Sequence, residues 1–117
     1  MSARDLARIG EMIRSRGMAG SRPVVSERWV ADTTTGGDDA AWQAGDLFHL
    51  LPRGRYRSKW YQTGDGAFCA IGIHGQWLYV DPAAHVVIVK QSCQHEPVDD
   101  ALDQECLAFC RRVATLA

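Results

Sequence analysis

The feature that most constrains the fold is a run of alternating apolar and polar residues, broken by turn signals, between residues 55 and 90. The segments YRSKWYQ and AFCAIGI flank TGDG, and QWLYVD and HVVIVK flank PAA. Alternation with a period of two is typical of β-strands, and short breaks rich in Gly, Asp and Pro are typical of hairpin turns. The region therefore predicts an antiparallel meander of three or four strands. We expect its last strand, Val86 to Val89, to be central because it is apolar on both faces.

Three segments outside the meander have helical spacing. SARDLARIGEMIRSRG carries Ser2 as an N-cap ahead of apolar residues at helical intervals, and a shorter helix is predicted to begin near Ser26. The C-terminal segment carries an amphipathic stripe that needs a sheet to lie on, formed by Leu102, Cys106, Phe109, Val113 and Leu116. The sequence thus predicts a single α+β domain over residues 1–117: an antiparallel β-sheet meander with two N-terminal helices and a C-terminal helix packed on the sheet.

Between the N-terminal helices and the meander lies a segment without sustained periodicity. Residues 33–46, TTTGGDDAAWQAGD, are rich in Thr, Gly and Asp and are predicted to form a surface loop. A loop of that length is unusual in so small a protein. Trp42 is a large ring in these polar surroundings, where such a ring usually needs something to cover it. Either the loop is functional, or it runs over a surface that the sequence does not contain.

Composition and charge exclude several classes of function. The 117 residues are 46% hydrophobic and 23% charged with a net charge of -1, as in a soluble globular domain. The densest basic run, RGRYRSK, is interpreted as a solvated strand face carrying Arg55, Arg57 and Lys59, so no nucleic-acid partner is expected. No apolar stretch approaches the roughly 18 residues that cross a bilayer, and no signal peptide is evident. We therefore expect no membrane partner and a cytoplasmic location.

The cysteines form no recognisable metal motif. Cys69, Cys93, Cys106 and Cys110 contain no Cys-x-x-Cys pair. Cys106 and Cys110 stand four residues apart on the predicted C-terminal helix, a spacing that suits two metal ligands but is also that of two core positions. We expect reduced, buried thiols, no metal and no cofactor. Cys69 lies five residues before His74 on a predicted strand, which places the two side chains on opposite faces and argues against a Cys–His pair.

The candidate functional residues lie in GIHGQ, residues 72–76. Gly72 and Gly75 flank His74, and such a neighbourhood permits close approach of the backbone to a ligand. This pattern alone leaves two interpretations open, an exposed polar hairpin tip or part of a ligand site. None of the six serines lies in a Gly-x-Ser-x-Gly or Ser-x-x-Lys motif, so the sequence offers no activated serine nucleophile.

Taken in order, SARDLARIGEMIRSRG, VVSERWV, SKWYQ and GIHGQWLYVDPAAHVVIVK, followed by a terminal helix, resemble the C-terminal part of serine hydrolases of the β-lactamase and penicillin-binding-protein superfamily. The branch they resemble contains class C-like esterases and 6-aminohexanoate-dimer hydrolases. The resemblance implies a partial β-lactamase-like fold and, in full-length relatives, amide or ester hydrolysis. It places His74 at the Lys or His position of a third active-site motif and gives a backbone N–H of Ile73, or of a neighbour, to the oxyanion hole. Gly75 stands where Thr or Ser is common.

The two other motifs of that superfamily, a Ser-x-x-Lys helix start and a Tyr-containing loop, are missing from the sequence. The resemblance therefore implies a truncated segment, catalytically inactive alone, in which Ile73, His74 and Gly75 remain from one motif. Apolar surface left bare would favour a homo-oligomer. Two alternatives stay open: a stand-alone module that binds a small carbonyl or carboxylate ligand near residues 73–76 or self-associates, and a residual hydrolase that uses Cys69 or another residue.

Overall fold

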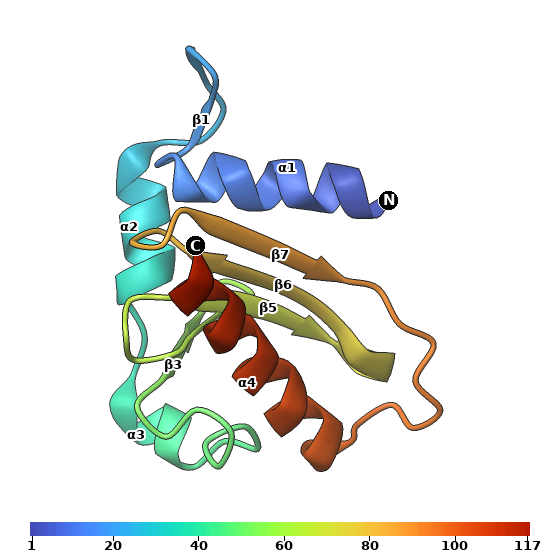
Figure 1. The fold of residues 1–117 in the computed structure, drawn as a ribbon. Coiled ribbons are helices and arrows are strands. Elements are labelled where there is room, and N and C mark those ends of the chain that lie inside the picture. Colours follow the sequence, from blue (N-terminus) through green and yellow to red (C-terminus); the bar gives the residue numbers. More distant parts are fainter.

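The computed structural model describes residues 1–117 and confirms the predicted α+β class, with four α-helices and two antiparallel sheets (Figure 1). The elements are α1 (Ala3–Arg14), β1 (Met18–Ala19), β2 (Arg22–Pro23), α2 (Glu27–Thr35), α3 (Asp39–Gln43), β3 (Arg55–Arg57), β4 (Trp60–Gln62), β5 (Phe68–Gly72), the 3-10 turn η1 (Ile73–Gly75), β6 (Gln76–Asp81), β7 (Val86–Lys90) and α4 (Asp100–Leu116). None of the helices combines the length and the apolar character that crossing a bilayer requires.

The main sheet is the predicted antiparallel meander, but it has five strands in the order β3-β4-β5-β6-β7. The additional strand arises because YRSKWYQ is not continuous. Ser58 and Lys59 have φ of 49° and 76°, the left-handed values of a tight turn, so β3 and β4 form a hairpin of their own. Lys59 therefore does not share a strand face with Arg55 and Arg57, contrary to the expectation from alternation. The β1–β2 ribbon was not predicted either.

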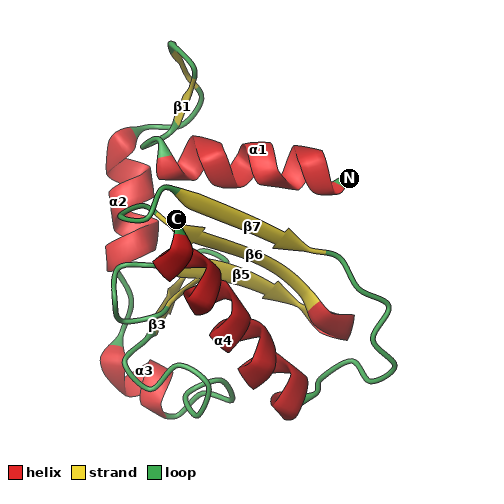
Figure 2. Cartoon of the chain, in the orientation of Figure 1, coloured by secondary structure: helices red, strands yellow, loops and turns green.

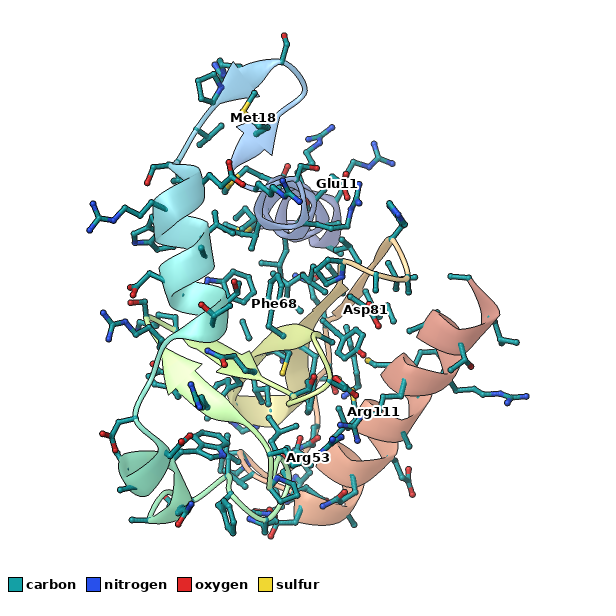
Figure 3. The ribbon with its side chains drawn as sticks, turned by 90° about the vertical axis from the view of Figure 1, so that its left-hand side faces the viewer. Glu11, Met18, Arg53, Phe68, Asp81 and Arg111 are labelled. Atoms are coloured by element: carbon teal, nitrogen blue, oxygen red, sulfur yellow. The ribbon has the colours of Figure 1, made fainter.

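Helices cover both faces of the sheet (Figures 1 and 2). In the view along the sheet, α1 and α2 lie on one side with Phe68, and α4 lies on the other with Arg111 (Figure 3). Strand β6 alternates accordingly: Leu78 and Val80 belong to the core under α1 and α2, whereas Trp77 and Tyr79 belong to the core under α4.

The prediction that Val86 to Val89 form a central strand is wrong, because β7 is an edge of the sheet. Its apolar character has another cause. Val87 and Val89 pack against the core on the α1 side, and Ile88 packs against the core on the α4 side. Coverage of both faces by helices therefore produces the same continuous apolar run that a central strand would show.

Close packing of α1 on the sheet depends on a glycine. Ser2 caps the helix: its Oγ accepts from the Asp5 N–H at 3.1 Å, and Asp5 completes a capping box. Further along, Gly10 is buried against β6 and β7, and a Cβ at this position would lie 2.7 Å from Val87 Cγ1 and 2.9 Å from Leu78 Cδ1. The helix therefore approaches the strands more closely than any side chain at residue 10 would allow.

The prediction of which residues of α4 face the sheet is wrong. Of its five residues only Cys106 is buried; Leu102, Phe109 and Leu116 are 41%, 60% and 73% exposed. The buried face is Asp103, Cys106, Leu107 and Cys110. The helix has apolar residues at helical spacing on two sides, and the side with small thiols is the one that packs in the core with the large rings of Trp77 and Tyr79.

Residues 33–46 are more regular than predicted. Helix α2 extends to Thr35, and α3 begins after Asp38, whose carboxylate accepts from the Ala41 N–H at 2.7 Å. This helix places Trp42 in the core under α4, where its indole N–H donates to the Leu51 carbonyl at 2.9 Å. The cover that Trp42 needs is therefore supplied by this chain itself.

Candidate functional site: a left-handed turn beside an acidic cavity

The turn η1, which joins β5 to β6, contains all three predicted site residues. His74 has φ 59° and ψ 30°, and Gly75 has φ 78°. Glycine adopts positive φ without steric cost, and His is among the residues that tolerate this region. Ile73 is 65% exposed, His74 is half-buried and Gly75 is buried. The local GIHGQ sequence therefore specifies the turn.

His74 is fixed by the segment that follows β7. Its backbone N–H donates to the Pro97 carbonyl at 2.9 Å, and its Nδ1 lies 3.0 Å from the Gln94 carbonyl. A carbonyl only accepts, so Nδ1 carries the proton of the neutral ring and Nε2 is the nitrogen left to accept. These bonds show that His74 is not a free polar tip. They also show that its backbone N–H is already occupied.

Further bonds attach Gly75 and the following Gln76 to the same segment. The Gln76 amide donates to the Ser92 carbonyl at 2.5 Å and accepts from the Ser92 N–H at 3.2 Å. The Lys90 ammonium donates to the Gly75 carbonyl at 3.0 Å. Residues 90–97 thus form a scaffold for η1, although they lie about twenty positions further along the chain.

The structure explains why residue 75 is glycine rather than a hydroxyl residue. A Cβ on residue 75 would lie 2.7 Å from Gln94 Oε1 and 2.9 Å from Lys90 Nζ. The positive φ adds a backbone cost for any residue with a side chain. The backbone cost opposes Ser or Thr here, and the ends of the Gln94 and Lys90 side chains would have to move to make room for either.

A cavity of about 460 Å³ lies beside Ile73. Its apolar walls include Leu47, Ile71 and the rings of Trp42 and Tyr61, whose centroids are 6.0 Å apart. Its carboxylate side chains are all aspartates, and no Lys, Arg or His lines it. The three aspartates are Asp46, Asp100 and Asp103. A carboxylate ligand, one of the two classes considered from the sequence, would meet three like charges.

Asp103 is the buried acid of this cavity. It is 8% exposed, and its Oδ1 accepts from the Trp77 indole N–H at 3.4 Å. Burial raises the pKa of Asp103 above its ordinary value, and the neighbouring charge of Asp100 adds to this. Asp103 forms no salt bridge; the nearby Lys90 ammonium donates to Gly75 instead. Asp100, at the more exposed side, pairs with His49 at 3.2 Å.

The cysteines do not join this site. Cys69 is fully buried on β5, and burial raises its pKa to about 12, which keeps it a thiol rather than a nucleophilic thiolate. Cys106 and Cys110 lie in the same core cluster on α4. No three His, Cys, Asp or Glu side chains gather closely enough to hold a metal ion.

The basic strand face is neutralised locally. Arg55 pairs with Asp39 at 2.6 Å, and Arg57 pairs with Asp32 at 3.0 Å. These acids come from α3 and α2, so each arginine ties a helix to β3. The pairs are partly exposed, as expected for a solvated face.

Sequence reasoning found the turn but missed the cavity. Asp103 was not singled out, although one signal was present: it precedes Cys106, Leu107 and Cys110 at the spacing of a single helix face. A carboxylate within an otherwise apolar stripe marks a buried charge, which needs a partner or a ligand. The signal was hidden because a second apolar stripe on α4 was assigned to the sheet.

Comparison with known proteins gives an informative similarity. No protein-family model matches the chain. A curated 6-aminohexanoate-dimer hydrolase from Paenarthrobacter ureafaciens is 41% identical over 98 residues. The matched stretch is 82% of this chain and 25% of the relative. The chain therefore spans about a quarter of the length of the curated relative that it matches.

Proposed function

We propose that Ile73, His74 and Gly75 form one wall of a site that hydrolyses amide or ester bonds. The proposal starts from the homology of this chain to part of a 6-aminohexanoate-dimer hydrolase, which confirms the predicted resemblance to that branch of the serine hydrolases. The wall contributes backbone geometry rather than the attacking group. No Ser-x-x-Lys sequence occurs among the 117 residues, so the nucleophile and its base are supplied by other residues.

The observation that carries this proposal is the fixed conformation of η1. A backbone donor stabilises a developing oxyanion only if it is held in place before the reaction. Bonds from residues 90–97 hold His74 and Gly75, the two residues that follow Ile73. The N–H of His74 is bonded to Pro97, so the donor assigned to the oxyanion is the N–H of Ile73.

In the proposed reaction a serine oxygen attacks the substrate carbonyl carbon, and the carbonyl oxygen gains the negative charge. The Ile73 N–H then donates to that oxygen while the charge is present. One such donor contributes about 3 to 4 kcal/mol to the transition state. His74 is anchored through Nδ1 and so holds the conformation of the turn, and its Nε2 is left to accept a hydrogen bond.

The test is a chimera in which this chain replaces the 98 matched residues of the relative. We expect the chimera to hydrolyse the relative's substrate. Ile73→Pro removes the proposed donor, and Gly72 before it has the extended conformation that a following proline requires. We expect kcat to fall about 10² to 10³-fold. Ile73→Val keeps the N–H and is the matched control.

Two results contradict the proposal. The first is a folded Ile73→Pro chimera with the kcat of the Ile73→Val control. The second is covalent labelling of the 117-residue chain by a fluorophosphonate, or ester turnover by it above a heat-denatured sample, because either would show that the chain contains its own nucleophile.

A further inference from the structure

We propose that α4 is an interface for a second copy of this chain, with the two helices antiparallel about a two-fold axis at Phe109. The surface involved is the outer stripe of α4, which we define as Leu102, Glu105, Phe109, Arg112 and Leu116, all exposed. None of these residues lines the cavity beside the η1 turn, so the association does not depend on the proposed role in hydrolysis.

The apolar part of the outer stripe has no cover. Leu102, Phe109 and Leu116 recur every seven residues, so they follow one line along the helix, and all three are exposed. No other element lies beyond α4 in the view along the sheet (Figure 3). Ala101 and Ala108, beside this line, are small and exposed, so a second helix can approach closely. Single exposed apolar residues are ordinary, but a row of this spacing is typical of a helix that packs against another.

The charges of α4 identify the occupant as a second copy. The first half of the helix carries Asp100, Asp103 and Glu105 and no basic residue. The second half carries Arg111 and Arg112 and no acidic residue. An antiparallel helix of the same sequence therefore sets acidic against basic side chains at both ends of the contact, and it also sets opposite helix dipoles side by side.

The residues of the outer stripe match one another about the axis. Leu102 and Leu116 are each seven residues from Phe109, so Leu102 of one copy lies opposite Leu116 of the other. Glu105 precedes Phe109 by four residues and Arg112 follows it by three, so the two come within one residue of each other across the axis. Neither has an ionic partner within its own chain. Each contact is made twice, as in an isologous interface.

The size of the contact predicts a weak, concentration-dependent dimer. The 17 residues of α4 span about 25 Å, and one helix pair of that length buries less than the roughly 800 Å² per partner of a standard stable interface. The experiment is sedimentation velocity on the 117-residue chain from micromolar to millimolar concentration. We expect the mean mass to rise from that of one chain toward that of two.

Substitutions assign the dimer to the outer stripe. Phe109→Ala should weaken dimerisation about tenfold or more, because the ring lies at the centre of the contact. Val24→Ala is the matched control, since it truncates an exposed apolar side chain far along the chain from α4. Both positions are exposed, and thermal unfolding followed by circular dichroism checks that each variant folds.

Charge reversal tests the antiparallel arrangement. Glu105→Arg or Arg112→Glu alone should weaken the dimer, because each sets like charges against one another across the axis. The double variant restores opposite charges and should regain most of the wild-type affinity. A chain that stays monomeric at every concentration would overturn the proposal and leave the outer stripe to a different polypeptide. A dimer that Phe109→Ala leaves unchanged, or a double variant weaker than both single ones, would also overturn it.

Discussion

Replacing Gly10 with alanine sets two opposing effects against each other. Gly10 lies inside α1, where alanine is favoured over glycine by about 1 kcal/mol. It is also the point of closest approach between α1 and the sheet. The new Cβ would lie 2.7 Å from Val87 Cγ1 and 2.9 Å from Leu78 Cδ1, both well inside the ordinary carbon–carbon contact distance of about 3.5 to 4.0 Å.

The steric effect is the larger of the two. To bring the shorter contact from 2.7 Å to an ordinary distance, α1 and β7 must separate by about 0.8 Å. Val87 cannot turn its Cγ1 away easily, because a β-branched side chain has few χ1 rotamers. Inserting a methyl group into a packed core costs about 1 to 3 kcal/mol. Two contacts below 3.0 Å place this substitution in the upper part of that range, which leaves a net loss of about 1 to 2 kcal/mol after the helix gain.

The measurement is urea unfolding followed by circular dichroism, with a fall in melting temperature of about 4 to 8 °C per kcal/mol as a second readout. Val87→Ala is the companion variant, because it removes the Cγ1 atom that causes the shorter contact. In that background Gly10→Ala should be close to neutral, which gives a coupling energy of about 1 kcal/mol or more. A Gly10→Ala variant more stable than the parent would refute the reasoning.

Three further outcomes can be checked. Gly75→Ala should lower the free energy of unfolding by more than Gly66→Ala does. Both residues have positive φ, which costs an alanine about 1 to 2 kcal/mol, but only residue 75 has neighbours within 4 Å of the new Cβ. Equal losses in urea unfolding would contradict this. In the native chain only Cys93 should react promptly with Ellman's reagent, whereas Cys69, with its pKa raised to about 12, and the other two should react only after denaturation. Asp103→Asn should raise the free energy of unfolding at pH 7. Burial raises the pKa of Asp103 in the fold, so protonation favours the folded state, and the advantage of the variant should disappear below about pH 4, as unfolding curves at several pH values can show.

The hairpins were predictable to the extent that their turns carry local signals. TGDG marks the turn between β4 and β5, and PAA marks the turn between β6 and β7. The registers of the β5–β6 and β6–β7 pairs follow the expected alternation. The β3–β4 hairpin was missed because its left-handed turn is made by Ser58 and Lys59, which are not typical residues for that conformation.

Two errors share one physical origin. The pattern of β7 shows that both of its faces are buried, and helical layers bury an edge strand as effectively as neighbouring strands do. Likewise α4 has two apolar stripes at helical spacing, and only packing against Trp77 and Tyr79 decides which one faces inward. Periodicity identifies buried faces but does not identify what covers them.

The candidate site shows the same limit. GIHGQ identified the turn because glycines and a histidine in sequence specify its backbone. The bonds that hold the turn come from residues 90–97, and the buried acid of the neighbouring cavity comes from α4. Neither contribution has a local signature, since both depend on where the chain passes after it leaves β7.

The segment between β7 and α4 has no regular structure, and most of its residues face solvent. By those criteria it would be chosen for loop shortening, tag insertion or sequence shuffling. Yet Gln94 and Pro97 accept the two bonds that orient His74. A change in this stretch would therefore alter the backbone around His74, some twenty positions earlier in the chain, while the protein still folds.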